Sequence, residues 1–231
     1  MRGGFIRNGD LVLGILLLGP VACCPQEPGG NPPSEVNAKW NRPLLFARQS
    51  KAGSAKEYMA VASGTRALFL KDRVTFQVPG STFQMRFLGS NNNAQPQGED
   101  QQAARVNYLV GGQQRDWLTD LPTYQTVAYH DIYPGIDVRF GFSGRRLKSE
   151  FVVAPGADPS RISFRYAGLG VPRIDERDAV FEMASGEFRE EGPKVYQWKQ
   201  GTNVRVPHAS LFPPTASSVL NWGRSTMRFR S

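Results

Sequence analysis

The chain has 231 residues, of which 40% are hydrophobic, 24 are glycine and 17 are proline, and its formal charge is +8. This length suffices for one well-buried domain, and short β-branched and aromatic runs without sustained 3.6-residue periodicity exclude a helical bundle. The charge does not predict a nucleic-acid-binding protein, because no four basic residues are consecutive. The N-terminal segment carries +1 and the C-terminal segment +3, so residues 23–207 carry only about +4.

Residues 1–22 have the pattern of a signal peptide. Arg2 and Arg7 precede an apolar run over residues 11–18, and small residues follow up to Ala22. A run of this length is too short to span a bilayer as an ordinary transmembrane helix. The pattern predicts export, with the domain secreted or located at a cell surface or in the periplasm.

Two adjacent cysteines, Cys23 and Cys24, follow directly and are the only cysteines of the chain. Adjacent cysteines rarely bridge each other, so the folded domain is predicted to contain no disulfide. Two interpretations stay open: one cysteine carries a lipid anchor, which would be the only membrane attachment, or the chain is simply secreted. Residues 23–42, rich in proline and glycine, are predicted to be a tether to the folded domain.

The predicted β-domain covers residues 43–207, and its first half consists of short strands separated by glycine and proline turns. These strands are expected at residues 58–62, 67–70, 74–78 and 82–88. The polar low-complexity stretch over residues 90–102 is predicted to be an exposed loop, and a division into two small β subdomains near residues 90–104 stays open. The spacing of the strands favours an antiparallel β-sandwich.

The second half contains Trp117, which is predicted to lie in a loop before a strand. Its indole either covers the edge of the sheet or the end of a sandwich, or offers a platform on which a sugar ring stacks. Further strands are expected at residues 106–110, 124–129, 136–142, 147–154, 162–166, 180–183 and 194–198. Three of them, over residues 124–154, are predicted to form an antiparallel β-meander.

Turn residues close each strand of this meander. Tyr133-Pro134-Gly135 is the first turn, because proline fixes φ at the leading corner and glycine accepts the positive φ that follows. Ser143-Gly144 is the second, a short hairpin connection. The third is Pro155-Gly156-Ala157-Asp158-Pro159, since prolines do not fit a ladder and Asp158 can bond its own backbone two residues on. After the first turn, Asp137 lies on the polar side of an alternating strand.

Several blocks occur in order along the chain: RVNYLVGG (residues 105–112), DWLTDLPTY (116–124), YPGID (133–137), APGADP (154–159) and PKVYQ (193–197). Over residues 43–206 the chain resembles the N-terminal domain of unknown function of secreted and surface bacterial proteins that continue into bacterial β-propeller repeats. The resemblance implies a class and a location rather than an activity. The chain departs from that family after Phe46, where residues 47–51 replace an acidic residue and an Asn-x-Gly-Gln motif.

His130 and Asp131 lie just before the first turn. The structural interpretation has Asp131 capping backbone amides before the first turn and His130 covering a strand end. A second hypothesis uses Asp131, Asp137 and Asp158 as calcium ligands, although no spaced D-x-D-x-D loop is present. No nucleophile elbow, phosphate-binding glycine loop or H-E-x-x-H occurs, and the acids of residues 187–191 are interpreted as solvated. Neither a catalytic residue, nor a metal, nor a cofactor is predicted.

The last segment, residues 208–231, has no acidic residue and loses the strand alternation. We expect this segment to be translated from a shifted reading frame of the gene. With permitted codons, a shift to the third base of each codon lets residues 213–222 encode Ala-Asp-Gly-Ile-Val-Gly-Phe-Glu-Leu-Gly, the block that the resemblance leads one to expect at this point. In that case the chain is a truncated domain that lacks its final strands.

The function predicted from these features is a non-catalytic exported or cell-surface β-domain that caps or presents a β-propeller or another binding region. The alternative is a carbohydrate-active or carbohydrate-binding domain, with Trp117, His130 and Asp131 as contacts and a cell-surface glycan or protein as partner. An adhesin acting alone is a third hypothesis and requires an exposed apolar or aromatic patch.

Overall fold

The computed structural model describes residues 11–16, 44–49, 56–62, 65–109, 117–176, 178–184, 186–199, 202–205 and 219–221. Across these residues the regular structure is β-strand, apart from one short 3-10 helix, η3 (Pro159–Arg161). None of the described segments forms a helix with the length and apolarity that a membrane crossing needs. The all-β prediction is therefore confirmed.

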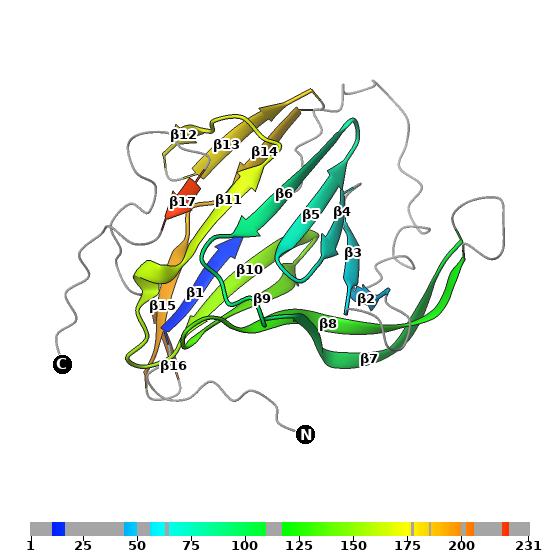
Figure 1. The fold of residues 1–231 in the computed structure, drawn as a ribbon, viewed down its shortest axis with the longest axis horizontal. Coiled ribbons are helices and arrows are strands. Elements are labelled where there is room, and N and C mark those ends of the chain that lie inside the picture. The colour runs from blue at the N-terminus through cyan, green and yellow to red at the C-terminus, as the bar shows by residue number, and fades with distance from the viewer. Residues whose placement is uncertain are drawn as a thin grey trace, which may run out of the picture.

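A long antiparallel sheet of 14 strands dominates the fold (Figure 1). In sheet order its strands are β16 (Thr202–Arg205), β15 (Lys194–Lys199), β1 (Leu11–Leu16), β10 (Arg146–Val153), β9 (Ile136–Ser143), β8 (Leu118–Tyr133), β2 (Phe46–Arg48), β3 (Tyr58–Ala62), β4 (Thr65–Phe69), β5 (Arg73–Val78), β6 (Ser81–Phe87), β11 (Ser163–Ala167) and β17 (Val219–Asn221), with β7 (Pro96–Tyr108) paired to β8. A second sheet contains β12 (Arg173–Asp175), β13 (Asp178–Met183) and β14 (Gly186–Glu190). Because β2 pairs with both β3 and β8, strands from both halves of the chain share the main sheet.

The main sheet curls so that its two arms face each other across an aromatic core. Phe69 of β4 lies 5.0 Å from Phe140 of β9 between ring centroids, in an edge-on arrangement. Phe151 of β10 stacks on Phe164 of β11 at 6.1 Å. Both pairs join strands that are not neighbours in the sheet, and each of these rings is at most 1% exposed. The alternation of apolar and polar residues along each strand thus places one face in a shared core.

Two buried tyrosine hydroxyls bridge segments far apart in the sequence. The hydroxyl of Tyr129 donates to the carbonyl of Leu70 at 2.7 Å, and that of Tyr133 donates to the carbonyl of Ser163. Burial raises the pKa of Tyr133 to about 12, although its bond to Ser163 partly opposes this. Burial also raises the pKa of Tyr129 well above its ordinary value. Both phenols therefore stay neutral and keep their donor protons, so these two buried hydroxyls are satisfied as burial requires.

The meander turns have the conformations that the sequence predicts. Gly135, Gly144 and Gly156 all have positive φ, at 71°, 60° and 82°. The carboxylate of Asp158 accepts from the backbone N–H of Ser160 at 2.9 Å, two residues on, and caps η3. The first two turns return β8, β9 and β10 into the antiparallel registers of a meander, and the third leads out of it through η3 to β11.

Gly135→Ala is expected to destabilise the protein more than Gly156→Ala. Both substitutions place a side chain in the left-handed region, at a cost of about 1 to 2 kcal/mol. At Gly135 the new Cβ would also lie 2.9 Å from the Cβ of Ala157, whereas nothing lies within 4 Å at Gly156. Urea unfolding of both variants measures the difference, and equal midpoints would contradict the close packing of the two turns.

The prediction of an exposed loop over residues 90–102 is wrong for its second part. Residues from Pro96 onward belong to β7, a 13-residue strand that pairs with the 16-residue β8 in a long ribbon (Figure 1). Pro96, Gly98 and Asp100 of β7 are residue types depleted in strands, but strand preference depends on the partner strand and on exposure. On this solvent-facing ribbon the backbone ladder decides the conformation. The strands β2, β12, β14, β16 and β17 were also not predicted.

Leu11–Leu16, the apolar core of the predicted signal peptide, forms strand β1 between β10 and β15. The sequence predicted no strand here. Without β1, the facing edges of β10 and β15 would have unpaired backbone N–H and C=O groups, and any extended segment nearby can pair with them. The pairing does not test export, which stays a prediction. Cys23, Cys24 and His208 lie outside the described residues, and of the tail the structure describes only β17.

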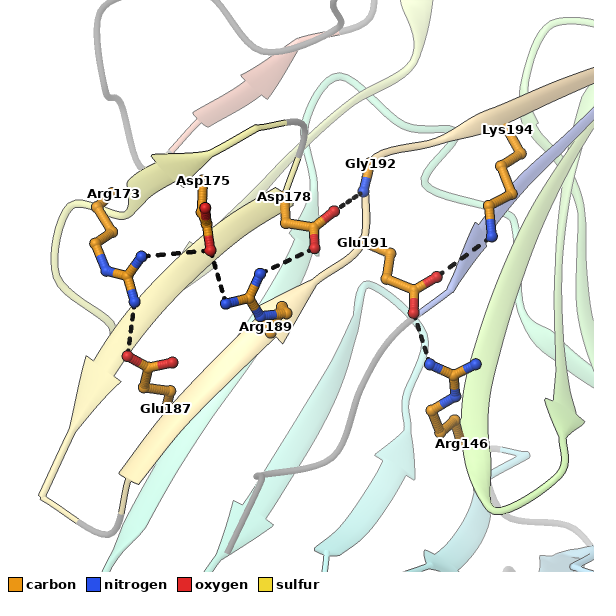
Figure 2. A network of polar contacts seen from close by, with 9 residues as sticks. All are labelled: Arg146, Arg173, Asp175, Asp178, Glu187, Arg189, Glu191, Gly192 and Lys194. Atoms are coloured by element: carbon orange, nitrogen blue, oxygen red, sulfur yellow. Dashed lines mark hydrogen bonds and ion pairs between the residues drawn. The ribbon is translucent and has the colours of Figure 1, made fainter. Parts of the chain in front are cut away.

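Ion pairs link the three strands of the small sheet to one another and the small sheet to the main sheet (Figure 2). Arg189 of β14 donates to the carboxylates of Asp175 at 2.9 Å and Asp178 at 3.1 Å, which holds the three strands together. Glu191 accepts from Arg146, at the start of β10, at 2.6 Å. The last contact links the end of β14 to the second turn of the meander.

Candidate functional site

The polar feature that the sequence singled out, His130-Asp131, lies in a bulge of β8. The register between β8 and β9 shifts between Tyr129, which faces Val138, and Tyr133, which faces Ile136. Three residues of β8 therefore oppose Asp137 alone, and Asp131 takes a positive φ of 48°. Bulges re-aim side chains and commonly lie beside functional groups.

Polar side chains satisfy the backbone that the bulge leaves unpaired. The carboxylate of Asp137 accepts from the backbone N–H of Asp131 at 2.8 Å. On the other side of the bulge, the side-chain amide of Asn91 donates to the carbonyl of Asp131 at 3.2 Å. The backbone N–H of Asn91 donates to the carbonyl of Ile132 at 2.9 Å. Asp131 in turn accepts from the N–H of Gly135 at 3.4 Å, in agreement with the predicted capping role.

Around His130 the bulge assembles a four-residue group, here called the histidine cluster: Glu99 of β7, His130 of β8, and Asp137 and Arg139 of β9. The Nδ1 of His130 lies 3.0 Å from Asp137 Oδ2, and its Nε2 lies 3.2 Å from Glu99 Oε1. Arg139 Nε lies 3.6 Å from the other oxygen of Glu99. Three neighbouring strands thus place two cations and two anions on the polar face of the sheet.

The carboxylates set the protonation state of the imidazole. The bonds to Asp137 and then to Glu99 raise the pKa of His130 to about 10, against a smaller opposing effect of burial. The pKa of Glu99 is lowered, chiefly by its bond to His130. Burial would raise the pKa of Asp137, but the bonds from His130 and from the Asp131 N–H outweigh it and the net shift is downward. At neutral pH the cluster is an imidazolium between two carboxylates.

This protonation state limits the chemistry of the cluster. A general base needs a free lone pair and a pKa near the working pH, whereas both ring nitrogens of His130 act as donors here. The histidine is placed to neutralise charge and to hold the bulge. The arrangement favours a structural clamp over acid–base catalysis.

His130 is expected to remain protonated from pH 5.5 to 8.5. Its folded pKa is raised above its ordinary value, so its stabilising contribution is complete below about pH 6.5 and declines as the pH rises from there toward 10. NMR titration of the imidazole Cε1 proton should show no transition in this range. In Asp137→Asn, which removes one carboxylate, a transition should enter the range. A wild-type midpoint near pH 6.5 would contradict the cluster.

The other predicted contact, Trp117, lies far from this cluster. It precedes Leu118, which pairs with Tyr108 at the outer end of the β7–β8 ribbon. His130 lies thirteen residues further along the chain, and at about 3.3 Å per strand residue the two positions are roughly 40 Å apart along β8. The structure does not bring Trp117 and the His130 region into one site.

Among the residues that the structure describes, no histidine, cysteine and carboxylate side chains are grouped so that they could hold a metal ion. The three aspartates of the calcium hypothesis serve separate backbone sites. Asp131 bonds the first turn, Asp137 bonds the bulge, and Asp158 bonds Ser160. Each carboxylate accepts from a backbone N–H, as expected of an aspartate with a structural role at a turn or bulge.

Glu190 is a buried acid that the sequence did not predict. Glu190 of β14 is 1% exposed, so the interpretation of residues 187–191 as solvated acids is wrong at this position. Neither of its carboxylate oxygens has a hydrogen bond of normal geometry, although the buried hydroxyl of Tyr166 is close enough to affect it. Burial raises the pKa of Glu190 to about 8. The alternation of Phe188 and Glu190 on one face of a short strand was the signal available in the sequence.

A row of arginines crosses the outer face of the main sheet. Arg73 of β5 pairs in register with Arg86 of β6, which pairs in register with Arg165 of β11. Like charges directly opposite each other on neighbouring strands are destabilising. Asp72 pairs with Arg73 at 2.7 Å, and Arg86 bonds the neutral amide of Gln84. We call these three residues the arginine row.

In a comparison with known families, residues 44–209 match the domain of unknown function DUF7948. No curated protein and no solved structure matches the chain. The match covers most of the sequence and the whole meander with its bulge and turns, and the chain therefore belongs to the family of the domain of unknown function DUF7948.

Proposed function

We propose that the chain is a non-catalytic exported β-domain that caps or presents a neighbouring binding region, a β-propeller in the proteins that it resembles. The observation that supports the non-catalytic part of the proposal is the histidine cluster, in which both nitrogens of His130 are held by carboxylates. His130 is thus engaged in holding a bulge, and the carboxylate of its neighbour Asp131 bonds the first turn. The signal-peptide pattern of residues 1–22 supports export.

Activity assays test the non-catalytic part. Purified full-length protein and His130→Ala are incubated with panels of glycans and peptides. We expect no turnover above the blank for either protein. Turnover by the wild type that His130→Ala abolishes would overturn the proposal.

Export is tested by expressing the whole chain in a bacterium and determining the mass of the product in each cell fraction. We expect cleavage close to Cys23. A lipid-modified cysteine would select the anchored form, and an unmodified N-terminus in the medium or periplasm would select simple secretion. An intact chain that remains in the cytoplasm contradicts export.

The arginine row favours a second function, the binding of an acidic polysaccharide. Guanidinium groups form bidentate hydrogen bonds with carboxylates. The arginines of the row lie on neighbouring strands, which are spaced about 4.8 Å apart. Arg165 is exposed and Arg86 is half-buried, so ligand groups can reach the row. The proposed ligand is a polysaccharide with a carboxylate on each sugar.

Binding to polygalacturonate, with a neutral polysaccharide for comparison, tests this function. Arg86→Ala with Arg165→Ala is expected to weaken binding at least tenfold, or about 1.4 kcal/mol. Arg145→Ala with Arg161→Ala, two exposed arginines outside the arginine row, is the control, because it also removes two positive charges. Equal losses in the two proteins would show a non-specific charge effect and reject the arginine row as a site.

A further inference from the structure

Strand β1 occupies a position inside the main sheet, with β10 on one side and β15 on the other. It runs antiparallel to both, and Leu13 is in register with Phe151 of β10 and Val195 of β15. Figure 1 shows β1 in dark blue between these two strands. Without β1 the main sheet has two facing edges with unpaired backbone groups at this place.

The two flanking strands are built as interior strands. Ser149, Phe151 and Val195 are fully buried, and Val153 is 3% exposed. On the opposite face, Glu150 and Lys194 are in register with Gly14 from either side. The position therefore has an apolar face and a polar face, and on the polar face Glu150 pairs with Lys148 of its own strand while Lys194 pairs with Glu191.

The occupant suits this position only in part. Leu11–Leu16 reads LVLGIL, in which Val12 and Ile15 are β-branched but a glycine stands at position 14, and glycine weakens a strand interior. At Gly14 no side chain can bond the flanking Glu150 or Lys194. A weak strand between two well-formed neighbours is a conflict between local and global preference.

We propose that the position of β1 is a strand-acceptor site, which takes an extended peptide from another polypeptide domain in place of Leu11–Leu16. The incoming strand runs antiparallel to β10. It carries apolar residues at the positions of Leu11, Leu13 and Ile15, and a hydroxyl or amide side chain at the position of Gly14. Main-chain bonds to both neighbours provide affinity, and the alternation of side chains provides specificity.

The acceptor site deepens the proposed function, since a domain that presents its neighbour needs a contact to it. β1 belongs to the predicted signal peptide, so processing would leave the position open for the partner strand. In the uncleaved chain β1 covers the two edges and protects them against unspecific pairing. Binding of a peptide to the uncleaved chain does not depend on whether export occurs, so the acceptor site and export can be tested separately.

Peptide binding to full-length protein tests the acceptor. The probe is a fluorescein-labelled peptide of residues 9–18 with threonine in place of Gly14 and two added lysines for solubility. Leu13→Pro removes a ladder bond of β1 and should bind the probe saturably, at least tenfold tighter than the wild type. Gly14→Thr strengthens β1 and should bind it more weakly than the wild type. A probe with proline at the position of Leu13 is the control and should not bind.

Equal binding of the probe by all three proteins, or none by a folded Leu13→Pro, would overturn the proposal. Folding is checked by near-ultraviolet circular dichroism. If Leu13→Pro does not fold, hydrogen exchange of the wild type and Gly14→Thr decides. Backbone amides of β10 and β15 should then exchange about fivefold more slowly in Gly14→Thr, and unchanged rates would reject the acceptor site.

Discussion

Glu190→Gln is expected to change stability little at pH 5 and to stabilise the protein strongly at pH 9. In the folded protein the pKa of Glu190 is raised from 4.5 to about 8 by burial. The folded state therefore holds the proton of Glu190 more tightly than the unfolded chain does. As the pH rises from about 4.5 to 8, unfolding releases this proton and the stability of the wild type falls.

A difference of this size in pKa corresponds to about 3 to 5 kcal/mol of pH-dependent stability. Glutamine has nearly the shape of the protonated acid and cannot ionise, so the variant should lack this decline. Urea unfolding at pH 5, 7 and 9 measures it. Glu191→Gln, which removes the neighbouring half-buried ion pair with Arg146, should cost about 1 kcal/mol or less at each pH. Parallel pH profiles of wild type and Glu190→Gln would show that Glu190 is solvated.

Phe188→Ala is expected to destabilise the protein by about 3 to 5 kcal/mol. Phe188 of β14 is 2% exposed and lies 4.8 Å from Phe83 and 5.3 Å from Tyr166, ring to ring. Its ring joins the small sheet to the core of the main sheet. Truncation leaves a cavity where the two sheets meet, and aromatic packing adds to the loss.

Two measurements separate this role from ordinary truncation. Phe142→Ala removes the same ring from a partly buried site beside Phe46 and should cost clearly less. Limited proteolysis of Phe188→Ala should cut within residues 173–190 before the rest of the chain. Simultaneous cleavage throughout the domain would show that the small sheet does not open independently.

Local chemistry in the sequence determined the meander and its turns. At Gly135 and Gly156 the chain needs positive φ, which glycine adopts without a Cβ clash, and at Asp158 a short carboxylate bonds the amide two residues on. Alternating strands between such turns can bury one face only by pairing. The all-β class followed from these residues, and so did the capping role of Asp131.

Long-range pairing decided the remainder. The polar residues of β7 form a strand because β8 supplies its ladder, and His130 meets Glu99 only because a bulge aligns three strands. Glu190 is buried because β14 packs against the aromatic core, a contact that neighbouring residues in the sequence do not encode. Leu11–Leu16 has the composition of a signal-peptide core and becomes a strand because β10 and β15 leave a position open between them. Backbone groups at a strand edge accept any extended partner, so its place in the sheet follows from tertiary structure alone.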